Sequence, residues 1–427
     1  MSSVQLYEPD GIPDDVVRFW RERQQAQDRF MSLTAGPEWY SMMAASRSGA
    51  VVAVVRGEQS SASAPSPSLR ATADKEVGSL PRVARGRKSE VGVRRTEDGG
   101  QTTDKGQGTT LRSRSGQADD RHLKAVLPLF PITWPLDFNL GGRCWFRRPL
   151  PVMRVCGGDL VEDGLTPEEL AAAWGILFER QPGVRGVWFD HAQAGRRSGM
   201  IRASAGGGFF VHEAFAGLPH YRLRLPPTVE ELRSRRSPES IKKIRGRERA
   251  LGKAAGGECR LIEIRRPADW EPYSEKIGGL MGRTWQSERL GHQFSLSSLA
   301  DVAARGWLRS FLLLAGERPA AFAFCFQGCG VFVYEQIGYD PDLAKYSPGT
   351  ILLYGLLERL YASDTPECVD FGEGEAEYKS LLANDVTHSD GLLVVHRGRS
   401  KETPFRAAAV LRKAGALLRS WSRSLKT

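Results

Sequence analysis

The sequence lacks any long apolar run and any secretory leader. Nowhere in its 427 residues do 18 apolar residues follow one another, and residues 1–5 have neither a basic segment nor an apolar one. These are the patterns that mark a membrane-spanning helix and a signal peptide. We therefore expect a cytoplasmic, soluble protein whose contact with a membrane is at most peripheral.

Cysteine is scarce, and its spacing is not that of a metal or disulfide site. The six cysteines are scattered and none forms a CxxC pair. Cys325 and Cys329 are the nearest neighbours, and both fall in a segment with strand character. The pattern indicates small core residues in a reducing compartment and predicts no metal.

The remaining composition is that of a basic globular protein. Hydrophobic residues make up 41% of the chain, ten are Trp, and the formal net charge is +10. Such a length allows two to three domains with sizeable cores. The charge favours an anionic partner without choosing among a nucleotide cofactor, nucleic acid and anionic lipid.

Residues 58–121 have no aromatic side chain and few large aliphatic ones. Such a composition cannot bury enough apolar surface to offset the entropy of ordering, so we predict a disordered insertion. Buried-strand patterns lie on both sides of it, at residues 50–55 and 123–130. We expect a hairpin whose tip this insertion replaces, and a solvated loop is favoured over a nucleic-acid or regulatory role.

The rest of the first half, 1–57 and 122–205, has the pattern of an α/β unit. We expect short strand-like and turn-like pieces up to residue 155, then a helix capped at Thr166 and a buried strand at 187–190. Residues 192–208 are rich in Gly, Ser and Arg. They predict an exposed loop or a domain boundary.

Residues 233–253 contain nine Lys or Arg against two Glu. This density of charge is typical of a surface that binds phosphate or an acidic polymer, but a solvated helix face gives the same pattern. Both interpretations stay open.

The most informative stretch is 331–379. A β-branched and aromatic run at 331–337 is followed by a loop with Tyr346-Ser347-Pro348-Gly349, a helical pattern at 351–361 and a strand at 368–371. If the two strands are parallel with the helix as crossover, the helix N-terminus and the end of the second strand face one cleft. Free amides at that N-terminus suit a ligand carrying phosphate.

A hairpin at 308–326 precedes this stretch, so three antiparallel strands lead into it. This order resembles the GNAT N-acyltransferase superfamily, and the short motifs resemble its CelD-like branch, the acetyltransferases of bacterial cellulose and exopolysaccharide biosynthesis. The motifs are Gly338-Tyr339-Asp340, Tyr346-Ser347-Pro348-Gly349, Ile351-Leu352-Leu353, Asp370-Phe371-Gly372, Gly374-Glu375 and Tyr378-Lys379, with Pro37-Glu38-Trp39 and Val126-Leu127-Pro128-Leu129 in the first half.

The resemblance implies a mixed α/β (α+β) fold of two tandem GNAT-like halves. The first half, 1–57 with 122–205, would be degenerate, and 206–400 would be the acyltransferase domain. Acetyl-CoA or another acyl-CoA would be the co-substrate. Its pyrophosphate would meet the backbones of Ser347, Gly349 and Thr350, with Lys345 and Tyr346 beside them; the usual GNAT signature of Arg or Gln with two spaced glycines is missing.

Amide formation from a thioester needs a base for the amine and an acid for the departing thiolate. By the resemblance, Glu335 lies on the strand that carries the base, and Tyr378 is the candidate acid. Asp370 is either catalytic or, as we favour, the acceptor of backbone N–H groups in the glycine loop that follows it. Lys379 and Glu375 are candidate substrate-binding residues. His388 is expected to be structural.

The predicted function is therefore N-acyl transfer to a small-molecule or glycan amine, with an amino sugar of envelope or exopolysaccharide synthesis as the candidate acceptor. One alternative is a Fem-type peptidoglycan transferase, whose aminoacyl-tRNA donor would be the one nucleic-acid partner. A second is a binding protein with a decayed GNAT site.

Residues 401–427 have an apolar stripe among Lys and Arg side chains at helical spacing. The stripe suits peripheral contact with the inner membrane or docking on the protein's own body.

Overall fold

The computed structural model describes residues 3–27, 36–45, 47–57, 122–140, 143–281 and 296–424; within these, the side chains of 25–27, 296–298 and 416–424 are not considered. Contacts divide the chain into one unit of 1–57 with 123–427 and another of 58–122. The predicted disordered insertion, 58–121, lies outside the described residues. The fold and the candidate site belong to the first unit.

One sheet of thirteen strands runs through this unit, in the order β1-β2-β3-β4-β6-β13-β7-β12-β11-β10-β9-β8, with β5 paired to β3. The strands are β1 Ser3–Tyr7, β2 Val51–Gly57, β3 His122–Leu140, β4 Arg143–Val155, β5 Val161–Glu162, β6 Gly186–Gln193, β7 Phe209–Arg224, β8 Cys259–Ile264, β9 Ser310–Ala315, β10 Arg318–Gly328, β11 Val331–Tyr339, β12 Cys368–Glu373 and β13 Asp385–His396. The neighbouring β2 and β3 lie on either side of the insertion, as expected.

The described helices are α1 Asp14–Gln27, α2 Pro37–Ala44, α3 Pro167–Arg180, α4 Arg196–Ala203, α5 Val229–Ser234, α6 Pro238–Ala254, α7 Pro267–Trp270, α8 Ser274–Met281, α10 Leu296–Ala304, α11 Pro348–Arg359, α12 Glu377–Leu382 and α13 Thr403–Ser424, with 3-10 turns η1 Pro9–Gly11, η4 Glu271–Tyr273, η5 Pro341–Tyr346 and η6 Leu360–Ala362. The capping box predicted at Thr166 is present, because its side chain accepts from the Glu169 amide while that glutamate accepts from the Thr166 amide.

The two halves repeat one motif, a parallel strand pair joined by a crossover helix. In the first half, β4 and β6 pair in parallel only at 152–154 with 186–188, and α3 connects them. In the second half, β11 and β12 pair in parallel only at 331–333 with 368–370, and α11 connects them. This confirms the parallel pair predicted for 331–371. Each pair is hydrogen-bonded over three residue pairs only, and we call the opening where this pairing ends the wedge.

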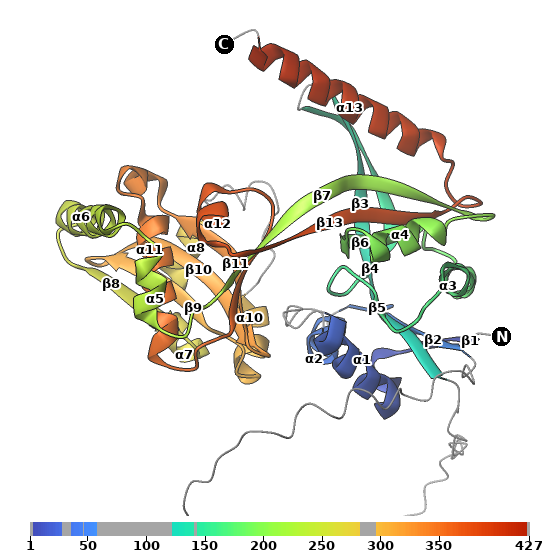
Figure 1. The fold of residues 1–427 in the computed structure, drawn as a ribbon, viewed down its shortest axis with the longest axis horizontal. Helices are drawn as coiled ribbons and strands as arrows, with labels where there is room; N and C mark the ends of the chain where they lie inside the picture. Colours follow the sequence, from blue (N-terminus) through green and yellow to red (C-terminus); the bar gives the residue numbers. More distant parts are fainter. Residues whose placement is uncertain are drawn as a thin grey trace, which may run out of the picture. The chain divides into compact units, whose positions relative to one another are not determined.

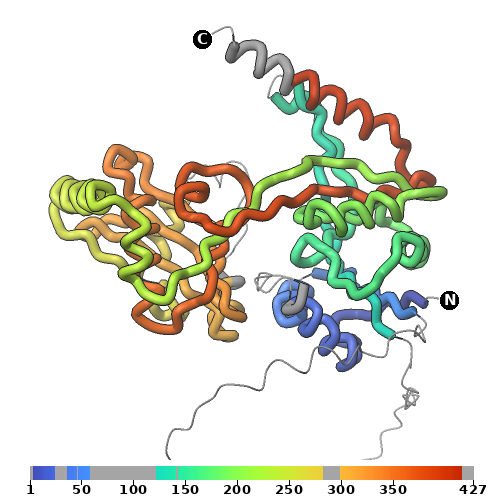
Figure 2. Tube along the Cα trace, in the orientation of Figure 1, coloured from blue at the N-terminus to red at the C-terminus, as the bar shows by residue number. Residues whose placement is uncertain are grey.

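Two long strands join the parallel pairs. Strand β13 lies between β6 and β7, and β7, which follows α4, lies between β13 and β12. The green β7 and the red β13 run side by side as the link in Figures 1 and 2. The halves therefore share one hydrogen-bonded sheet.

The meander expected before the key stretch is confirmed, since β9, β10 and β11 are antiparallel in sequence order. The ladder between β10 and β11 skips one residue. Phe324 is opposite Gln336 and Cys325 is opposite Tyr334, so Glu335 is the extra residue of a β-bulge. A bulge re-aims side chains locally, and this one lies where β11 leaves β12.

Two expectations for the first half were wrong. The short pieces predicted up to residue 155 are one long antiparallel hairpin of β3 and β4, in which prolines pair directly, as at Pro135 with Pro149. Proline lowers strand propensity because it lacks an N–H donor, but tertiary pairing overrides that preference here. The exposed loop predicted at 192–208 contains α4, whose Met200 and Ile201 are buried.

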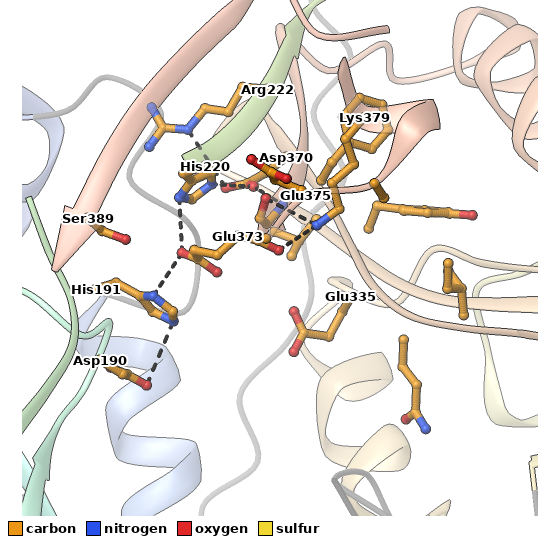
Figure 3. A pocket seen from close by; sticks show the side chains of 18 of the residues that line it. Asp190, His191, His220, Arg222, Glu335, Asp370, Glu373, Glu375, Lys379 and Ser389 are labelled. Atoms are coloured by element: carbon orange, nitrogen blue, oxygen red, sulfur yellow. Dashed lines mark hydrogen bonds and ion pairs between the residues drawn. The ribbon is translucent and has the colours of Figure 1, made fainter. Parts of the chain in front are cut away.

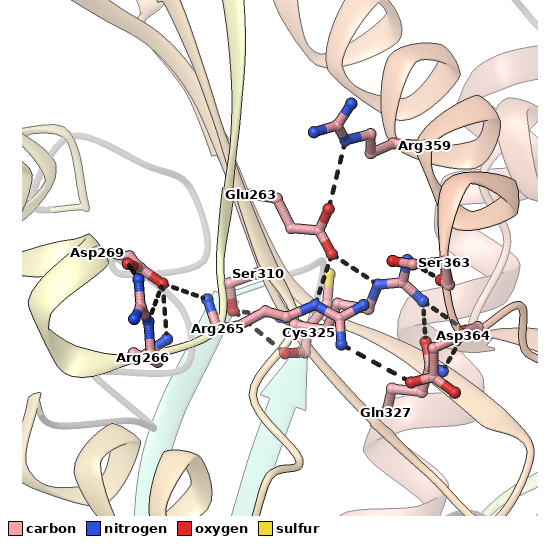
Figure 4. A network of polar contacts seen from close by, with 11 residues as sticks. Glu263, Arg265, Arg266, Asp269, Ser310, Cys325, Gln327, Arg359, Ser363 and Asp364 are labelled. Atoms are coloured by element: carbon pink, nitrogen blue, oxygen red, sulfur yellow. Dashed lines mark hydrogen bonds and ion pairs between the residues drawn. The ribbon is translucent and has the colours of Figure 1, made fainter.

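A buried arginine network ties the end of the crossover to the meander (Figure 4). Arg309, directly before β9, is 1% exposed, and its guanidinium donates to Glu263 (3.0 Å), Gln327 (2.6 Å) and the backbone oxygens of Ser363 and Asp364 (both 2.8 Å). Because these partners come from β8, β10 and the turn before β12, the network fixes where β12 starts.

The first half of α13 docks on the protein. Phe405 is 3% exposed and lies 5.3 Å from the Phe210 ring, and Ala408 is also buried. Arg412 donates to the backbone oxygens of Glu213 and Ala214, whereas Val410 is 64% exposed. Among the described residues, no helix combines the length and apolar character that crossing a bilayer requires.

Candidate active site

A cavity of about 1800 Å³ lies where the wedge of the second half faces residues of the first half. From the second half it is lined by β11, the start of α11, and the turn between β12 and α12. From the first half it is lined by residues near α2 and on β3, β4 and β6. The residues that line the cavity include Arg47, Phe130, Arg154, Asp190, His191, His220, Arg222, Glu335, Ser347, Gly349, Thr350, Asp370, Glu373, Glu375, Tyr378 and Lys379.

The predicted phosphate-binding turn lies on this cavity. Ser347 adopts left-handed backbone angles (φ 54°, ψ 54°) and Pro348 begins α11. Two of the three predicted donor amides are used inside the turn, since Ser347 N–H donates to Ala344 and Thr350 N–H donates back to Ser347. The amide of Gly349 is not used this way within the described residues. It is therefore the one of the three that is available to an anion.

Two other residues predicted for the cofactor lie elsewhere. Lys345 and Tyr346 do not line the cavity, and the Lys345 ammonium lies 5.0 Å from the ring centre of its neighbour Tyr346. A cation placed on an aromatic face in this way is stabilised by the ring quadrupole. Both residues belong to η5, the turn that directly precedes Ser347 and α11.

Glu335, the predicted base, projects into the cavity from the bulge on β11 (Figure 3). Its side chain is exposed to the space of the cavity, and the cavity walls surround it. Burial raises the pKa of Glu335, and the nearby Glu373 and Asp370 raise it further, while Arg154 and His191 oppose the rise. A carboxylate with a raised pKa is a stronger base at neutral pH than an ordinary glutamate.

Asp370 holds the glycine turn, the role favoured from the sequence. Its carboxylate accepts the Gly372 N–H at 2.7 Å, and Gly372 and Gly374 both have positive φ. Lys379 completes this turn, because its ammonium is buried and donates to the backbone oxygens of Gly372 (3.3 Å) and Glu373 (2.6 Å). Burial lowers the pKa of Lys379, which the Glu373, Asp370 and Glu335 carboxylates oppose. The Glu375 side chain is exposed on the same turn.

Tyr378, the predicted acid, lies at the start of α12 and lines the cavity. Its ring meets Phe371 and Tyr334 edge-on at 6.0 and 6.1 Å. Burial raises the pKa of Tyr378 to about 12. Its phenol is therefore protonated at neutral pH, and within the described residues it has no hydrogen-bond partner.

The sequence reasoning missed the charged chain that crosses the cavity (Figure 3). His220 Nε2 lies 2.6 Å from Asp370 Oδ1, and His220 Nδ1 lies 3.0 Å from Glu373 Oε1. His191 Nδ1 lies 3.1 Å from the same oxygen of Glu373, and its Nε2 lies 3.8 Å from Asp190 Oδ2. Acid and imidazole alternate from β6 of the first half to β12 of the second.

The centre of this chain is a fixed positive charge. Burial alone would lower the pKa of His220, but Asp370 and Glu373 outweigh it and raise the pKa to about 10. Burial opposes ionisation of Glu373, yet His220 and His191 hold its pKa at about 2. His220 is therefore an imidazolium at neutral pH that holds two carboxylates in place, and it is not available as a base.

The sequence does contain a signal for two members of this row of charged side chains. Asp190 and His191 directly follow the buried run 187–189, at the carboxyl end of a strand, where ligand-binding residues of α/β sheets gather. His220 carried no comparable signal, because only the pairing of β7 with β12, which is distant in the chain, brings it to Asp370. His388, expected to be structural, lines the same cavity on β13.

The chain was compared with family models, curated proteins and solved structures. The family model of the acetyltransferase (GNAT) domain matches residues 236–380. None of the curated proteins compared with the chain matches it. A tandem GNAT protein from the clavulanic acid biosynthesis pathway is 12% identical and covers 94% of this chain and 100% of its own, with a TM-score of 0.49.

Two further solved structures are similar. FemX is 11% identical, covering 66% of this chain and 86% of its own, with a TM-score of 0.43. The C-terminal domain of a putative lysylphosphatidylglycerol synthetase from Agrobacterium fabrum is 11% identical, covering 69% of this chain and 85% of its own, with a TM-score of 0.39. The family-model match over residues 236–380 and the order of the strands together show the mixed α/β GNAT fold expected from the sequence.

Proposed function

We propose that this chain is an acyl-CoA-dependent N-acyltransferase that transfers an acetyl or other acyl group to an amine. The observation that carries the proposal is the position of Glu335. It projects from a bulge at the opening of the β11–β12 wedge, into the same cavity as the Gly349 amide at the start of α11. The reaction needs a base for the amine and a site for the diphosphate of the donor, and this wedge contains a candidate for each.

The residues of the wedge fit the co-substrate. The Gly349 amide lies at the positive end of the α11 dipole, where a diphosphate is favoured. A Cβ at Gly349 would have its nearest neighbour at 3.7 Å, on Tyr339, so the backbone borders open space. When bound, acyl-CoA would supply a thioester carbonyl for the amine to attack.

Two proton transfers complete the reaction. Glu335 would take a proton from the acceptor ammonium, so that the neutral nitrogen can form the bond to the acyl carbon. The carbon–sulfur bond then breaks and its electron pair leaves on sulfur. Tyr378, protonated and facing the same cavity, would give its proton to that thiolate.

Calorimetric titration of acetyl-CoA tests the proposal. Gly349→Asp places a carboxylate in the first turn of α11, which favours the helix but repels a diphosphate. Its melting temperature should equal or exceed that of the wild type, while acetyl-CoA binding weakens at least about tenfold. Gly199→Asp on α4, exposed and with nothing within 4 Å of its Cβ, is the matched control. Absence of binding by the wild type, or equal weakening in both variants, contradicts the proposal.

The acceptor we propose is an amino sugar of envelope or exopolysaccharide synthesis. A volume of about 1800 Å³ with polar walls from both halves can hold a sugar beside the acyl donor. We place the reaction in the cytoplasm.

A second candidate donor is aminoacyl-tRNA. The exposed side chains on α6 include Lys242, Lys243, Arg245, Arg249 and Lys253. Such a face would bind phosphates, and tRNA affinity measured by fluorescence anisotropy should then fall by orders of magnitude between about 50 and 200 mM salt. An activity that acetyl-CoA saturates and salt leaves unchanged excludes this candidate.

A further inference from the structure

Two arginines of the first half face the cavity, and they differ in their partners. Arg154 on β4 forms an ion pair with Asp190. Arg47, just after α2, lies on the Phe130 ring with its guanidinium carbon 4.8 Å from the ring centre. Among the residues that the structure describes, no carboxylate lies within ion-pair distance of Arg47.

Within the described part of the chain, Arg47 therefore has no acidic partner, although it lies in a partly closed place. Its side chain is half-buried, and burial together with the neighbouring Arg154 lowers its pKa. Two guanidinium groups near each other repel, and withdrawing one from water adds to the cost unless an anion compensates. Stacking on Phe130 fixes the planar group and leaves its N–H donors to bind a second partner.

The opposite wall of the cavity is acidic. Glu335, Asp370, Glu373 and Glu375 all line it from the second half. The Arg154 charge lowers the raised pKa of Glu335, and the charge of Glu335 in turn raises that of Arg154. Arg47, Arg154 and the proposed base Glu335 all line this one cavity of about 1800 Å³, so a molecule bound in it can contact residues of both halves.

We infer that the acceptor is an amine that also carries an anionic group, a carboxylate or a phosphate, and that Arg47 binds that group. The amine then points to Glu335 and the anionic group to the first half. Amino acids, amino uronic acids and amino-sugar phosphates have this chemistry. The inference rests on the proposed acyl transfer. In it, the first half of the chain selects the acceptor.

Matched pairs of acceptors test the inference. Glucosamine 6-phosphate is compared with glucosamine, and 4-aminobutyrate with butylamine, using acetyl-CoA and detection of the released thiol. In the wild type the anionic member of at least one pair should have the higher kcat/KM, by roughly 10- to 100-fold, the worth of a hydrogen bond to a charged group. Which pair shows the preference then indicates whether the anionic group of the acceptor is a phosphate or a carboxylate.

Arg47→Gln should remove most of that preference, because it should raise KM for the anionic amine more than for the neutral amine. Arg148→Gln, an exposed arginine on β4 outside the cavity, should keep the preference. If Arg47 served only to pack on Phe130, its replacement would lower the melting temperature and affect both members of each pair equally.

A binding measurement without acetyl-CoA separates this inference from the proposed function. Saturation-transfer NMR should detect the anionic amines on the wild type and not on Arg47→Gln, even if no acyl transfer occurs. Binding of neither anionic amine, equal binding of a neutral and an anionic amine, or unchanged binding by Arg47→Gln would overturn the inference. Should Arg47→Gln fail to fold, the comparison of the matched pairs on the wild type decides.

Discussion

Replacing His220 by Ala should destabilise the protein in a way that depends on pH. The imidazolium lies between Asp370 and Glu373, which are both largely buried. The pKa of His220 is raised from 6.5 to about 10, and at about 1.4 kcal/mol per pH unit that shift corresponds to about 5 kcal/mol. The same interactions lower the pKa values of Asp370 and Glu373, so their free energy is included once, through the shift of His220, and is not added again for the carboxylates. We expect a loss of roughly 3–5 kcal/mol near pH 6, typical of a broken buried pair.

The sign of the pH dependence follows from the two directions of shift. The pKa of His220 is raised, so its contribution is complete below pH 6.5 and is lost as the pH rises through about 10. The pKa of Glu373 is lowered from 4.5 to about 2, so its contribution is complete above pH 4.5 and is lost as the pH falls toward 2. The difference between wild type and variant should be largest between pH 4.5 and 6.5.

Urea denaturation followed by Trp fluorescence at pH 3, 6, 8 and 10.5 measures this difference. The cost of His220→Ala should shrink at both ends of the series. Val394→Ala, which removes buried methyl groups from β13, is the control whose cost should be the same at every pH. A cost for His220→Ala that stays constant from pH 6 to 10.5 would refute an imidazolium held by two carboxylates.

Three further predictions concern stability, catalysis and membrane contact. Arg309→Ala should cost roughly 3–5 kcal/mol in urea denaturation, because it leaves the Ser363 backbone oxygen and Gln327 Oε1 without their donor and removes one of the arginines that pair with Glu263; the exposed Arg305→Ala should cost under about 1 kcal/mol. Glu335→Gln should lower kcat about 10²- to 10⁴-fold. Wild-type activity should rise with pH as Glu335 loses its proton at a raised pKa, and this rise should be absent from the variant. A variant with the wild-type pH profile would contradict the role of Glu335 as the base. Ending the chain after residue 415 keeps the docked Phe405 and should reduce flotation with anionic liposomes, whereas unchanged flotation argues against contact through α13.

The second half could be predicted from its sequence because its signals are local. Alternation of apolar residues, the Pro348-Gly349 start and the glycine turn after Asp370 each depend on neighbours in the chain. They indicated the meander, the parallel pair and the crossover helix. Glu335 could be placed on its strand but not in its bulge, since a bulge is a property of two paired strands.

The charged chain of Asp190, His191, Glu373, His220 and Asp370 could not be predicted as a whole, because it depends on pairing between strands that are distant in the sequence. His220 reaches Asp370 only when β7 inserts beside β12, and His191 reaches Glu373 only because the two halves share a sheet. Lys379 shows the opposite error. A lysine after a glycine turn resembles a phosphate ligand in sequence, but its ammonium is directed to the backbone of that turn.

A crystal structure of the protein with coenzyme A tests the central claim most directly. We predict the diphosphate within hydrogen-bond distance of the Gly349 amide, at the start of α11, and the sulfur in the β11–β12 wedge beside Glu335 and Tyr378. Coenzyme A bound at the equivalent wedge of β4 and β6, or on the basic face of α6 with the β11–β12 wedge empty, would contradict the claim.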